Sequence, residues 1–320
     1  MRADINTIAK ECGVSKATVS RVFTGKASVS EQVKERILRT ARELNYTPQQ
    51  VAAREVIALV VKSLDDTETG DGFRTVLLIN LVGEITRAGF LLNIIEARDI
   101  DKILDSYTKA AVLLLNEEEM AEYGEKIDKM KIPLIALGNM IRNCHCISFD
   151  NYAEISTAVE YLIENGHRKI SIILDNALIW AGKERWRGYV ETMEKHGLLP
   201  MPKYNYQLGR QSLMELIATM LQDEPTAMII CGESISNEAA YAMNLLRVKV
   251  PMDLSVISFE KRDSSRWFSP PHTSIDQDAR NMVAESINLI KELIVAPSRE
   301  KSCKLLPCNL IIRNSVKNIK

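Results

Sequence analysis

The chain has 320 residues, enough for two or three compact domains. Hydrophobic residues make up 46% and charged residues 26% of the sequence, which excludes a wholly disordered, collagen-like or coiled-coil chain. No run of roughly 20 apolar residues occurs, and the polar N-terminus MRADINTIAK lacks the apolar core of a signal peptide. We therefore expect no membrane span and a cytoplasmic location.

Charge is unevenly distributed along the chain. Residues 1–55 carry a net charge of +4, whereas the remaining residues carry −5. A small basic head on a mildly acidic body points to a polyanion-binding module attached to a second domain. The six cysteines are too few for a disulfide framework in a chain of this length, which fits a reducing compartment.

The first 45 residues have the pattern of three short helices. Asp4 or Asn6 caps the first helix, Ser15 the second and Ser30 the third, and Pro48 ends the pattern. Apolar side chains recur at helical spacing in the first and third helices, so we expect the three to pack together.

From residue 56 onward, short apolar runs alternate with amphipathic segments. Strands are predicted at 56–61, 90–95, 111–115, 133–137, 169–174, 227–231 and 254–259. Helices are predicted at 74–88, 152–165, 183–196, 211–222 and 236–246, with another between the third and fourth strands. This alternation is typical of parallel sheets with crossover helices. The pattern is repeated over most of the chain after residue 56, which favours two α/β lobes over one.

The second predicted helix has two different sides. Val19 and Val22 lie on one side, and the other side is small, cationic and polar, with Lys16, Ala17, Ser20 and Arg21. This arrangement is typical of a helix-turn-helix, whose second helix enters the DNA major groove. On the pattern alone, a generic three-helix bundle with a solvated basic face fits equally well.

Each position on the outer side of this helix has a candidate DNA contact. Arg21 can read guanine bidentately, Lys16 can reach a guanine or a phosphate, and Ala17 can touch a thymine methyl group. Short hydroxyl side chains suited to phosphate contacts complete the set: Thr18, Ser20 and Thr24.

Short motifs occur in a fixed order along the chain. They are GVSKATVSRV, VSEQVKERI and ELNYTP in the head, then FDNYAEISTAVEYLIENGHRKISII, ERWRGYVETMEKHGL, VPMDLSVISFEKRD, PPHTSIDQD and LLPCNLIIRNS. In order and spacing they resemble the lactose-repressor (LacI/GalR-type) family of bacterial transcriptional regulators, over nearly the whole chain.

The resemblance implies a helix-turn-helix DNA-binding domain at residues 1–48, a shortened hinge at 49–56 and an effector-binding and dimerisation domain at 57–320. The last would have the periplasmic-binding-protein fold, with two Rossmann-like lobes, parallel sheets and three crossovers. The implied function is a repressor of a carbohydrate-utilisation operon, controlled by a small carbohydrate-like effector in the cleft. The resemblance also implies palindromic operator DNA as a partner. Because no apolar heptad tail follows IIRNS, we expect a homodimer.

The hinge departs from the family pattern. PQQVAAREV leads directly into IALVV, so the usual linker is missing. Val56 stands where the family has a wedge residue that kinks the minor groove, and it is also the first residue of a predicted strand. Val56 is therefore a candidate DNA contact or a strand residue, and its β-branched, apolar surroundings favour the strand.

The resemblance also indicates where the effector would bind. Candidate contacts are Phe73, Trp180, Arg185, Glu233, Glu260 and Gln277. Gly138 and Gly232 replace the usual short polar residues, which suggests extra room, and Lys261 adds positive charge. We therefore expect a larger, modified or anionic ligand held by Arg185. Alternatively, Arg185 pairs with Glu260 or Glu233 to hold the lobes together, and the aromatic candidates are core or lid residues.

Other signals carry little weight. Cys144, His145 and Cys146 are too close in sequence to converge on one metal, since strand side chains alternate, so a strand-end loop is favoured. His167 is expected to be a structural loop residue. No GxSxG, HExxH, GxGxxG, CxxC or phosphate-loop motif occurs, so we expect no enzyme, cofactor or metal. The competing hypothesis is a small-molecule binding protein of the same fold with weak or lost operator function.

Overall fold

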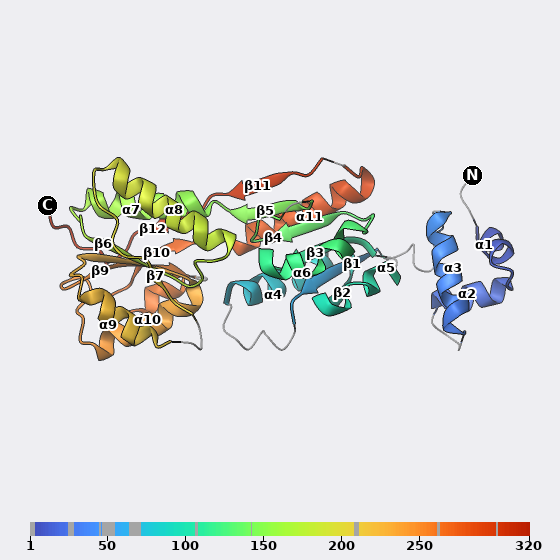
Figure 1. Ribbon diagram of the computed structural model, residues 1–320, viewed down its shortest axis with the longest axis horizontal. Coiled ribbons are helices and arrows are strands. Elements are labelled where there is room, and N and C mark those ends of the chain that lie inside the picture. The colour runs from blue at the N-terminus through green and yellow to red at the C-terminus, as the bar shows by residue number, and fades with distance from the viewer. Residues whose placement is uncertain are drawn as a thin grey trace.

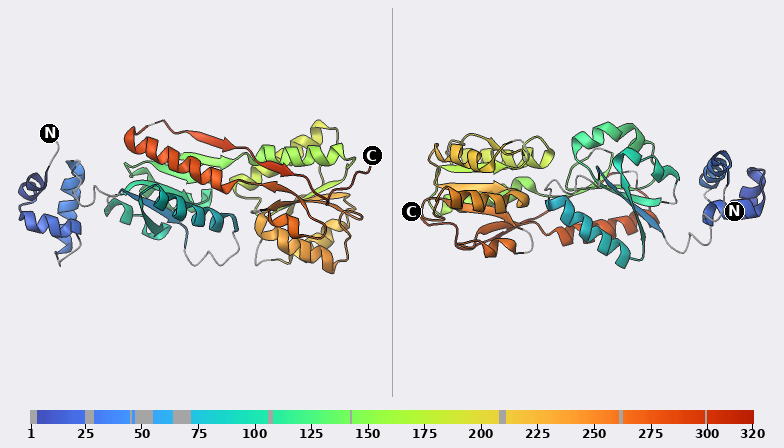
Figure 2. Two further views of the ribbon diagram at one scale, coloured as in Figure 1. Left: turned by 180° about the vertical axis from the view of Figure 1, so that it is seen from behind. Right: turned by 90° about the horizontal axis from the view of Figure 1, so that it is seen from below.

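A three-helix head and two α/β lobes make up the computed structural model, which Figure 1 shows with its longest axis horizontal. The described residues are 4–24, 29–44, 46, 55–63, 72–105, 108–141, 143–207, 211–260, 263–298 and 300–320. In both Figure 1 and Figure 2 the head lies at one end, beyond the lobe that contains β1.

The head contains α1 (Ile5–Glu11), α2 (Lys16–Thr24) and α3 (Glu31–Glu43), which confirms the three predicted helices. Asp4 caps α1, because its carboxylate accepts a hydrogen bond from the Thr7 backbone amide. The three helices bury a small shared core that consists of Ile8, Ala9, Cys12, Val19, Ile37 and Ala41.

The first lobe, called the N-lobe, is a six-stranded sheet in the order β11-β5-β4-β3-β1-β2, and all of its strand pairs are parallel. Its strands are β1 (Val56–Val61), β2 (Leu91–Glu96), β3 (Thr108–Leu114), β4 (Leu134–Leu137), β5 (His145–Phe149) and β11 (Cys303–Leu306). Helices α4 (Gly72–Arg87) and α11 (Ala279–Val295) pack on one face. The other face is covered by α5 (Lys102–Asp105) and α6 (Glu117–Asp128).

The second lobe, called the C-lobe, repeats this architecture in the order β12-β10-β9-β8-β6-β7, with only β12 antiparallel among the described strands. Its strands are β6 (Ile170–Leu174), β7 (Tyr204–Asn205), β8 (Ala227–Cys231), β9 (Ser255–Glu260), β10 (Thr273–Asp276) and β12 (Asn309–Ile311). Helices α7 (Asn151–Glu164) and α8 (Trp180–Lys195) cover one face, and α9 (Leu213–Leu221) and α10 (Glu233–Leu245) cover the other.

Three crossovers connect the lobes, as the family resemblance implies. The first joins β5 to α7 around Asp150, the second joins β10 to α11 around Gln277, and the third joins β11 to β12 around Cys308. Figure 2 shows these segments running through the junction between the lobes. The predicted two-lobed α/β fold with parallel sheets is therefore correct.

Val56 is the first residue of β1, where it pairs with Leu91 of β2 and Thr108 of β3. The strand interpretation is confirmed, and the structure corrects the candidate role of Val56 as a minor-groove wedge, because its backbone belongs to the sheet. The remaining hinge positions from 49 to 54 lie outside the described residues. Among the described helices, none is long and apolar enough to cross a membrane.

Candidate functional site

One face of α2 is open to solvent. Val19 of this helix is completely buried against α1 and α3, which turns Lys16, Ala17, Ser20 and Arg21 outward. Thr18 is half-buried, and its backbone amide and hydroxyl group bond to Ser15 Oγ at 3.0 and 2.8 Å. Its hydroxyl therefore helps to cap the helix, while the side chain of Thr24 lies outside the described residues.

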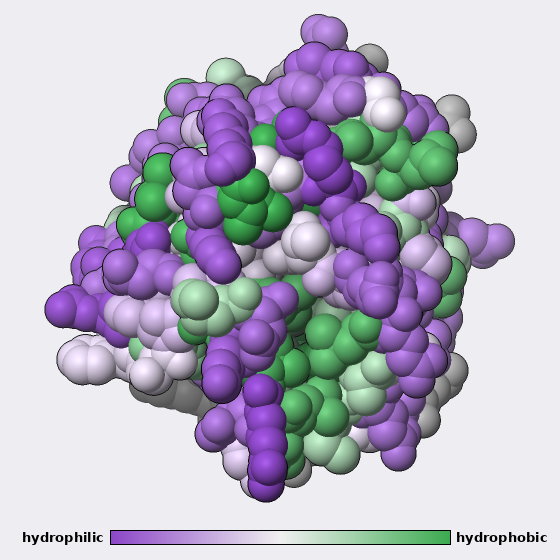
Figure 3. All heavy atoms as spheres, turned by 90° about the vertical axis from the view of Figure 1, so that its left-hand side faces the viewer, coloured by the Kyte–Doolittle hydropathy of each residue, from purple (hydrophilic) through white to green (hydrophobic). Residues whose placement is uncertain are grey.

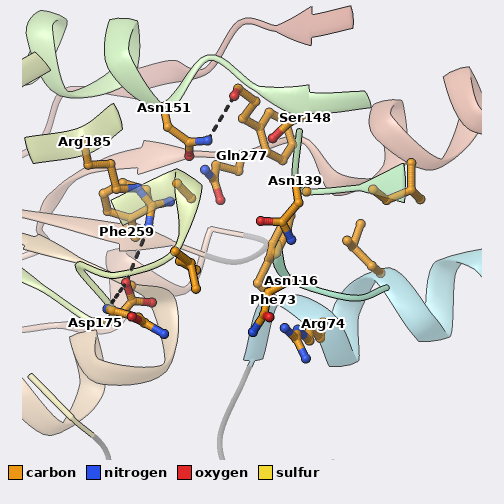
Figure 4. A pocket seen from close by; sticks show the side chains of 18 of the residues that line it. Phe73, Arg74, Asn116, Asn139, Ser148, Asn151, Asp175, Arg185, Phe259 and Gln277 are labelled. Carbon is orange, nitrogen blue, oxygen red and sulfur yellow. Dashed lines mark hydrogen bonds and ion pairs between the residues drawn. The ribbon is translucent and has the colours of Figure 1, made fainter. Parts of the chain in front are cut away.

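A cavity of about 250 Å³ lies between the two lobes. Its lining comes from α4 and the carboxyl ends of β3 and β4 in the N-lobe, and from the carboxyl ends of β6, β8 and β9 in the C-lobe. Parallel α/β sheets place ligands at this edge. Figure 4 shows Phe73, Arg74, Asn116 and Asn139 on one side of the space and Asp175, Arg185 and Phe259 on the other.

Two buried polar atoms of the N-lobe wall have no partner among the described residues. Asn139 donates from Nδ2 to the Leu115 carbonyl oxygen at 3.1 Å, but its Oδ1 accepts nothing. Ser148 Oγ has no hydrogen bond either. Asn139 is 7% exposed and Ser148 is 1% exposed, and both line the cavity. An unmade hydrogen bond at a buried polar group costs about 1–3 kcal/mol, so a ligand that bonds to these atoms recovers that cost.

Phe73 forms an aromatic wall of the cavity. Its ring lies 5.9 Å from that of Phe149 in an edge-to-face arrangement. Gly138 makes room for this ring, because a Cβ there would lie 3.1 Å from Phe73 Cε1. The missing side chain at Gly138 therefore accommodates Phe73 and does not enlarge the cavity.

Arg185 lies in the C-lobe wall and is held by two carboxylates. Its Nε donates to Glu154 Oε1 at 2.8 Å, and its Nη1 lies 3.5 Å from Asp175 Oδ1. The guanidinium also stacks over Phe259, 4.6 Å from the ring centroid. Burial opposes the charge on Arg185, but the carboxylates of Glu154 and Asp175 outweigh burial and raise its pKa.

Gly232 accommodates one of these carboxylates. Its φ is +136°, and a Cβ there would lie 2.7 Å from Asp175 Oδ2. The space that the sequence suggested was free is therefore occupied by Asp175. The predicted extra room in the cavity is wrong at Gly232 as it is at Gly138, because neighbouring side chains fill both positions.

The structure brings together three of the six predicted effector contacts. Phe73, Arg185 and Gln277 line the cavity. Trp180 begins α8 and is half-buried, but the cavity lining uses its neighbours Ile179 and Ala181. The structure therefore does not support Trp180 as a contact.

The predicted acidic contacts have a different outcome. Glu260 is buried and does not line this cavity. Both of its carboxylate oxygens accept hydrogen bonds from Arg313 Nη2, at 3.1 and 3.0 Å. The alternative pairing of Arg185 with Glu260 is wrong, since Glu260 pairs with Arg313 and the described partners of Arg185 are Glu154 and Asp175. Its pairing with Glu233 stays a prediction. The side chain of Glu233 and all of Lys261 lie outside the described residues.

Sequence reasoning missed most of the polar lining. The missed residues follow or end strands: Asn116, Asn139, Ser148, Asn151, Asp175 and Asn176. The rule that ligands gather at strand carboxyl ends predicts these positions, once each strand end is searched for short polar side chains.

The cysteines and His167 have structural surroundings. No group of three metal-ligating side chains is found in the part of the chain that the structure describes. His145 and Cys146 belong to β5, so the loop predicted there is limited to Cys144. His167 is buried, and its ring nitrogens lie 3.0 Å from Thr226 Oγ1 and 3.1 Å from the Lys317 carbonyl oxygen, as expected for a structural residue.

Comparison with known proteins connects both sites to one family. Residues 4–49 match the model for bacterial regulatory proteins of the lacI family, and residues 159–316 match a periplasmic binding protein-like domain. The chain belongs to the lacI family of bacterial regulatory proteins. The HTH-type transcriptional repressor PurR of Histophilus somni is 27% identical over 344 residues, which cover 99% of this chain and 100% of that protein. PurR of Vibrio vulnificus is 26% identical over 342 residues, 99% of each chain.

Solved structures of this family have the same fold. A lac repressor dimer bound to operator and the anti-inducer ONPF superposes with a TM-score of 0.72 at 20% identity, over 99% of this chain and 100% of that one. A CelR–cellobiose complex gives 0.71 at 22% identity, over 98% and 100%. As a lacI-family member, the chain is a DNA-binding regulatory protein with an effector-type domain, and not an enzyme.

Proposed function

We propose that this lacI-family protein is a transcriptional repressor that binds palindromic operator DNA as a homodimer. Its DNA affinity is controlled by a small, neutral, carbohydrate-like effector in the cavity between the lobes. The observation that carries the effector part of the proposal is the pair of buried, unpartnered polar atoms in the N-lobe wall, Asn139 Oδ1 and Ser148 Oγ.

The outward face of α2 supports operator binding. The exposed residues of this face are Lys16, Ala17, Ser20 and Arg21, which are short or cationic side chains of the kind that contact bases and phosphates in the major groove. Arg21 would read a guanine, and Lys16 a guanine or a phosphate. Thr18 would contribute to the cap of the reading helix more than to phosphate contacts, because its hydroxyl already bonds to Ser15.

Exposed apolar side chains support a homodimer. On the N-lobe they lie on α4 and the edge strand β2, and include Ile79 at 60% exposure. On the C-lobe, Tyr241, Leu245 and Met252 are more than half exposed. Figure 3, which views the C-lobe end, shows hydrophobic side chains gathered in patches among hydrophilic ones. Apolar side chains exposed in patches are typical of a protein–protein interface.

The chemistry of the cavity favours a neutral ligand. Asn139 Oδ1 can only accept a hydrogen bond, so the ligand must present a donor such as a hydroxyl group. A carboxylate or a fully ionised phosphate has no donor to offer there. Arg74 and Arg185 do not attract an anion strongly, since Arg74 is 3.1 Å from Glu119 and Arg185 faces two carboxylates. The partners of these arginines therefore favour a neutral ligand over the anionic ligand expected from the sequence.

The size of the cavity favours a compact ligand. At about 250 Å³ it is slightly smaller than the ~300–1,000 Å³ of pockets that hold drug-sized molecules. Phe73 supplies an apolar ring, and five amide or hydroxyl side chains supply polar contacts: Asn116, Asn139, Ser148, Asn151 and Gln277. A monosaccharide-sized polyol with one apolar face matches this combination better than a large ligand does.

Calorimetry of the full chain tests the effector part. The panel contains neutral monosaccharides, sugar phosphates and uronates. We expect at least one neutral sugar to bind, and Asn139→Leu to abolish its binding. The matched control Asn288→Leu, at an exposed position of α11, should bind normally. Binding of only the anionic members, or binding unaffected by Asn139→Leu, would contradict the proposed ligand class.

A second candidate function is a small-molecule binding protein whose head has lost operator function. DNA-binding assays with a palindrome selected from a random library separate the two. A repressor prefers one palindrome and loses affinity steeply with salt. The absence of any selected sequence would favour the second candidate.

A further inference from the structure

Glu154 is a fully buried carboxylate behind the cavity. It lies in the first turn of α7, and its side chain is 0% exposed. Its Oε1 accepts from Arg185 Nε at 2.8 Å. Its Oε2 accepts from Gln277 Nε2 at 2.8 Å and from Cys308 Sγ at 3.0 Å. One carboxylate thus receives three hydrogen bonds from three separate segments of the chain.

Two of these segments belong to the crossovers that connect the lobes. Glu154 itself follows the first crossover, Gln277 lies on the second and Cys308 on the third. Arg185 lies on α8 and faces the cavity, as Gln277 also does. The carboxylate of Glu154, just after the first crossover, therefore accepts hydrogen bonds from the cavity wall and from the second and third crossovers.

We propose that Glu154 is a positioning residue that couples the cavity to the hinge, by holding Arg185 toward the ligand and fixing the second and third crossovers relative to the first. A ligand that draws Arg185 or Gln277 toward itself changes the hydrogen bonds available to the other crossovers. The regulatory meaning of this coupling rests on the proposed function, but the coupling itself does not require a known ligand.

The charge of Glu154 is essential to this role. An ionised carboxylate has only acceptors and satisfies all three donors at once. A glutamine of the same shape has one acceptor oxygen in place of two, so its NH₂ group either faces the Arg185 donor or requires Gln277 to turn its own amide over. Hydrogen bonds to charged groups are also about twice as strong as neutral ones. Glu154→Gln therefore preserves the packing but weakens the connections, because every bond to the carboxylate loses its charge-assisted character.

Hydrogen exchange of the full chain, followed by mass spectrometry, tests the coupling without effector or DNA. In Glu154→Gln, we expect exchange about tenfold faster in peptides that cover the second crossover, the third crossover or both. The control is Glu160→Gln on the same helix, where an exposed pair with Lys195 is lost. It should leave both crossovers unchanged. Equal exchange in the two variants, or a change limited to α7, would overturn the proposal.

A double-mutant cycle tests whether the cavity acts through Glu154. Arg185→Gln alone should accelerate exchange at Gln277 or Cys308, although neither is bonded to Arg185. In the Glu154→Gln background, the same substitution should add little. Additive effects on the two crossovers would show that Glu154 is only a local structural residue and would overturn the proposal.

The thiol of Cys308 gives an independent readout. Burial and the Glu154 carboxylate both raise its pKa, with Asp150 acting in the same direction and Arg185 in the opposite one. In a Cys303→Ser background, which removes the exposed thiol, Glu154→Gln should let Cys308 react with iodoacetamide at lower pH. An unshifted pH profile would show that the two side chains are not coupled and would contradict the proposal. Failure of the sugar or DNA assays leaves these three tests unaffected.

Discussion

Gly232→Ala tests the way in which the C-lobe wall is assembled. Gly232 follows β8 at φ +136°, where an L-residue is strained, and an added Cβ would meet three atoms of Asp175 between 2.7 and 2.9 Å. The alanine must therefore either shift the backbone or push the Asp175 carboxylate away from Arg185.

The magnitude follows from two contributions. Holding a non-glycine residue in this region costs about 1–3 kcal/mol, and forcing Asp175 off its rotamer costs about 0.5–1.5 kcal/mol. A loss of about 2–4 kcal/mol in unfolding free energy is expected. Gly197→Ala is the matched control, because Gly197 also has a positive φ, +67°, but no atom lies within 4 Å of its added Cβ. It should lose only about 1–2 kcal/mol.

Urea unfolding of both variants, followed by tryptophan fluorescence, measures the difference. Calorimetry with a sugar that binds the parent protein then tests the cavity, where only Gly232→Ala should weaken binding. Equal destabilisation by the two variants, with ligand affinity unchanged in both, would refute the argument that Gly232 exists to accommodate Asp175.

Three further substitutions test the DNA-binding helix, the first strand and a buried histidine. Arg21→Ala should cost about 1–3 kcal/mol in specific DNA binding and relax specificity at one base pair per half-site, unlike Arg39→Ala on the exposed side of α3; equal weakening on random DNA would indicate a phosphate contact. Val56→Ala should lower the unfolding free energy by about 1 kcal/mol and leave operator bending in a circular-permutation assay unchanged, whereas reduced bending would restore the wedge role. Burial and the charge of Arg313 lower the pKa of His272 to about 4. Below pH 6.5 the unfolded chain therefore binds a proton at this histidine and the folded chain does not, so the free energy of unfolding falls as the pH is lowered from 6.5 toward 4. Urea unfolding should show a fall of about 2 kcal/mol between pH 7 and 5 that His272→Gln lacks, and identical falls would contradict the assignment.

The fold was largely predictable because its central strands are continuous apolar runs. The strands 56–61 and 227–231 agree with β1 and β8 to the residue. Strand β11 was harder to find, since three of its four residues are exposed and no apolar run marks it. Helix α11 is not among the predicted helices, although its buried residues recur at helical spacing.

The cleft was predictable from the sequence, but its ion pairs were not. Strand carboxyl ends predicted where the cavity lies, and Arg185 was correctly expected there. Its partner Glu154 is 31 residues away, and the partner of Glu260 is Arg313, 53 residues away. Tertiary packing decides such pairs, so no local pattern indicates which carboxylate neutralises which arginine. The same reason explains why Gly138 and Gly232 suggested empty space that Phe73 and Asp175 fill.

The central claim is that a neutral ligand in the cavity changes the affinity of the head for DNA. Fluorescence anisotropy with a selected palindrome, measured at fixed salt with and without a neutral sugar that binds the full chain, tests it most directly. Allosteric coupling is typically worth 1–3 kcal/mol, so we expect the dissociation constant for DNA to change by roughly 5- to 150-fold, and Asn139→Leu to abolish the change while DNA binding without sugar stays intact. A DNA affinity that does not respond to the bound sugar, or a response that persists in Asn139→Leu, would contradict the account.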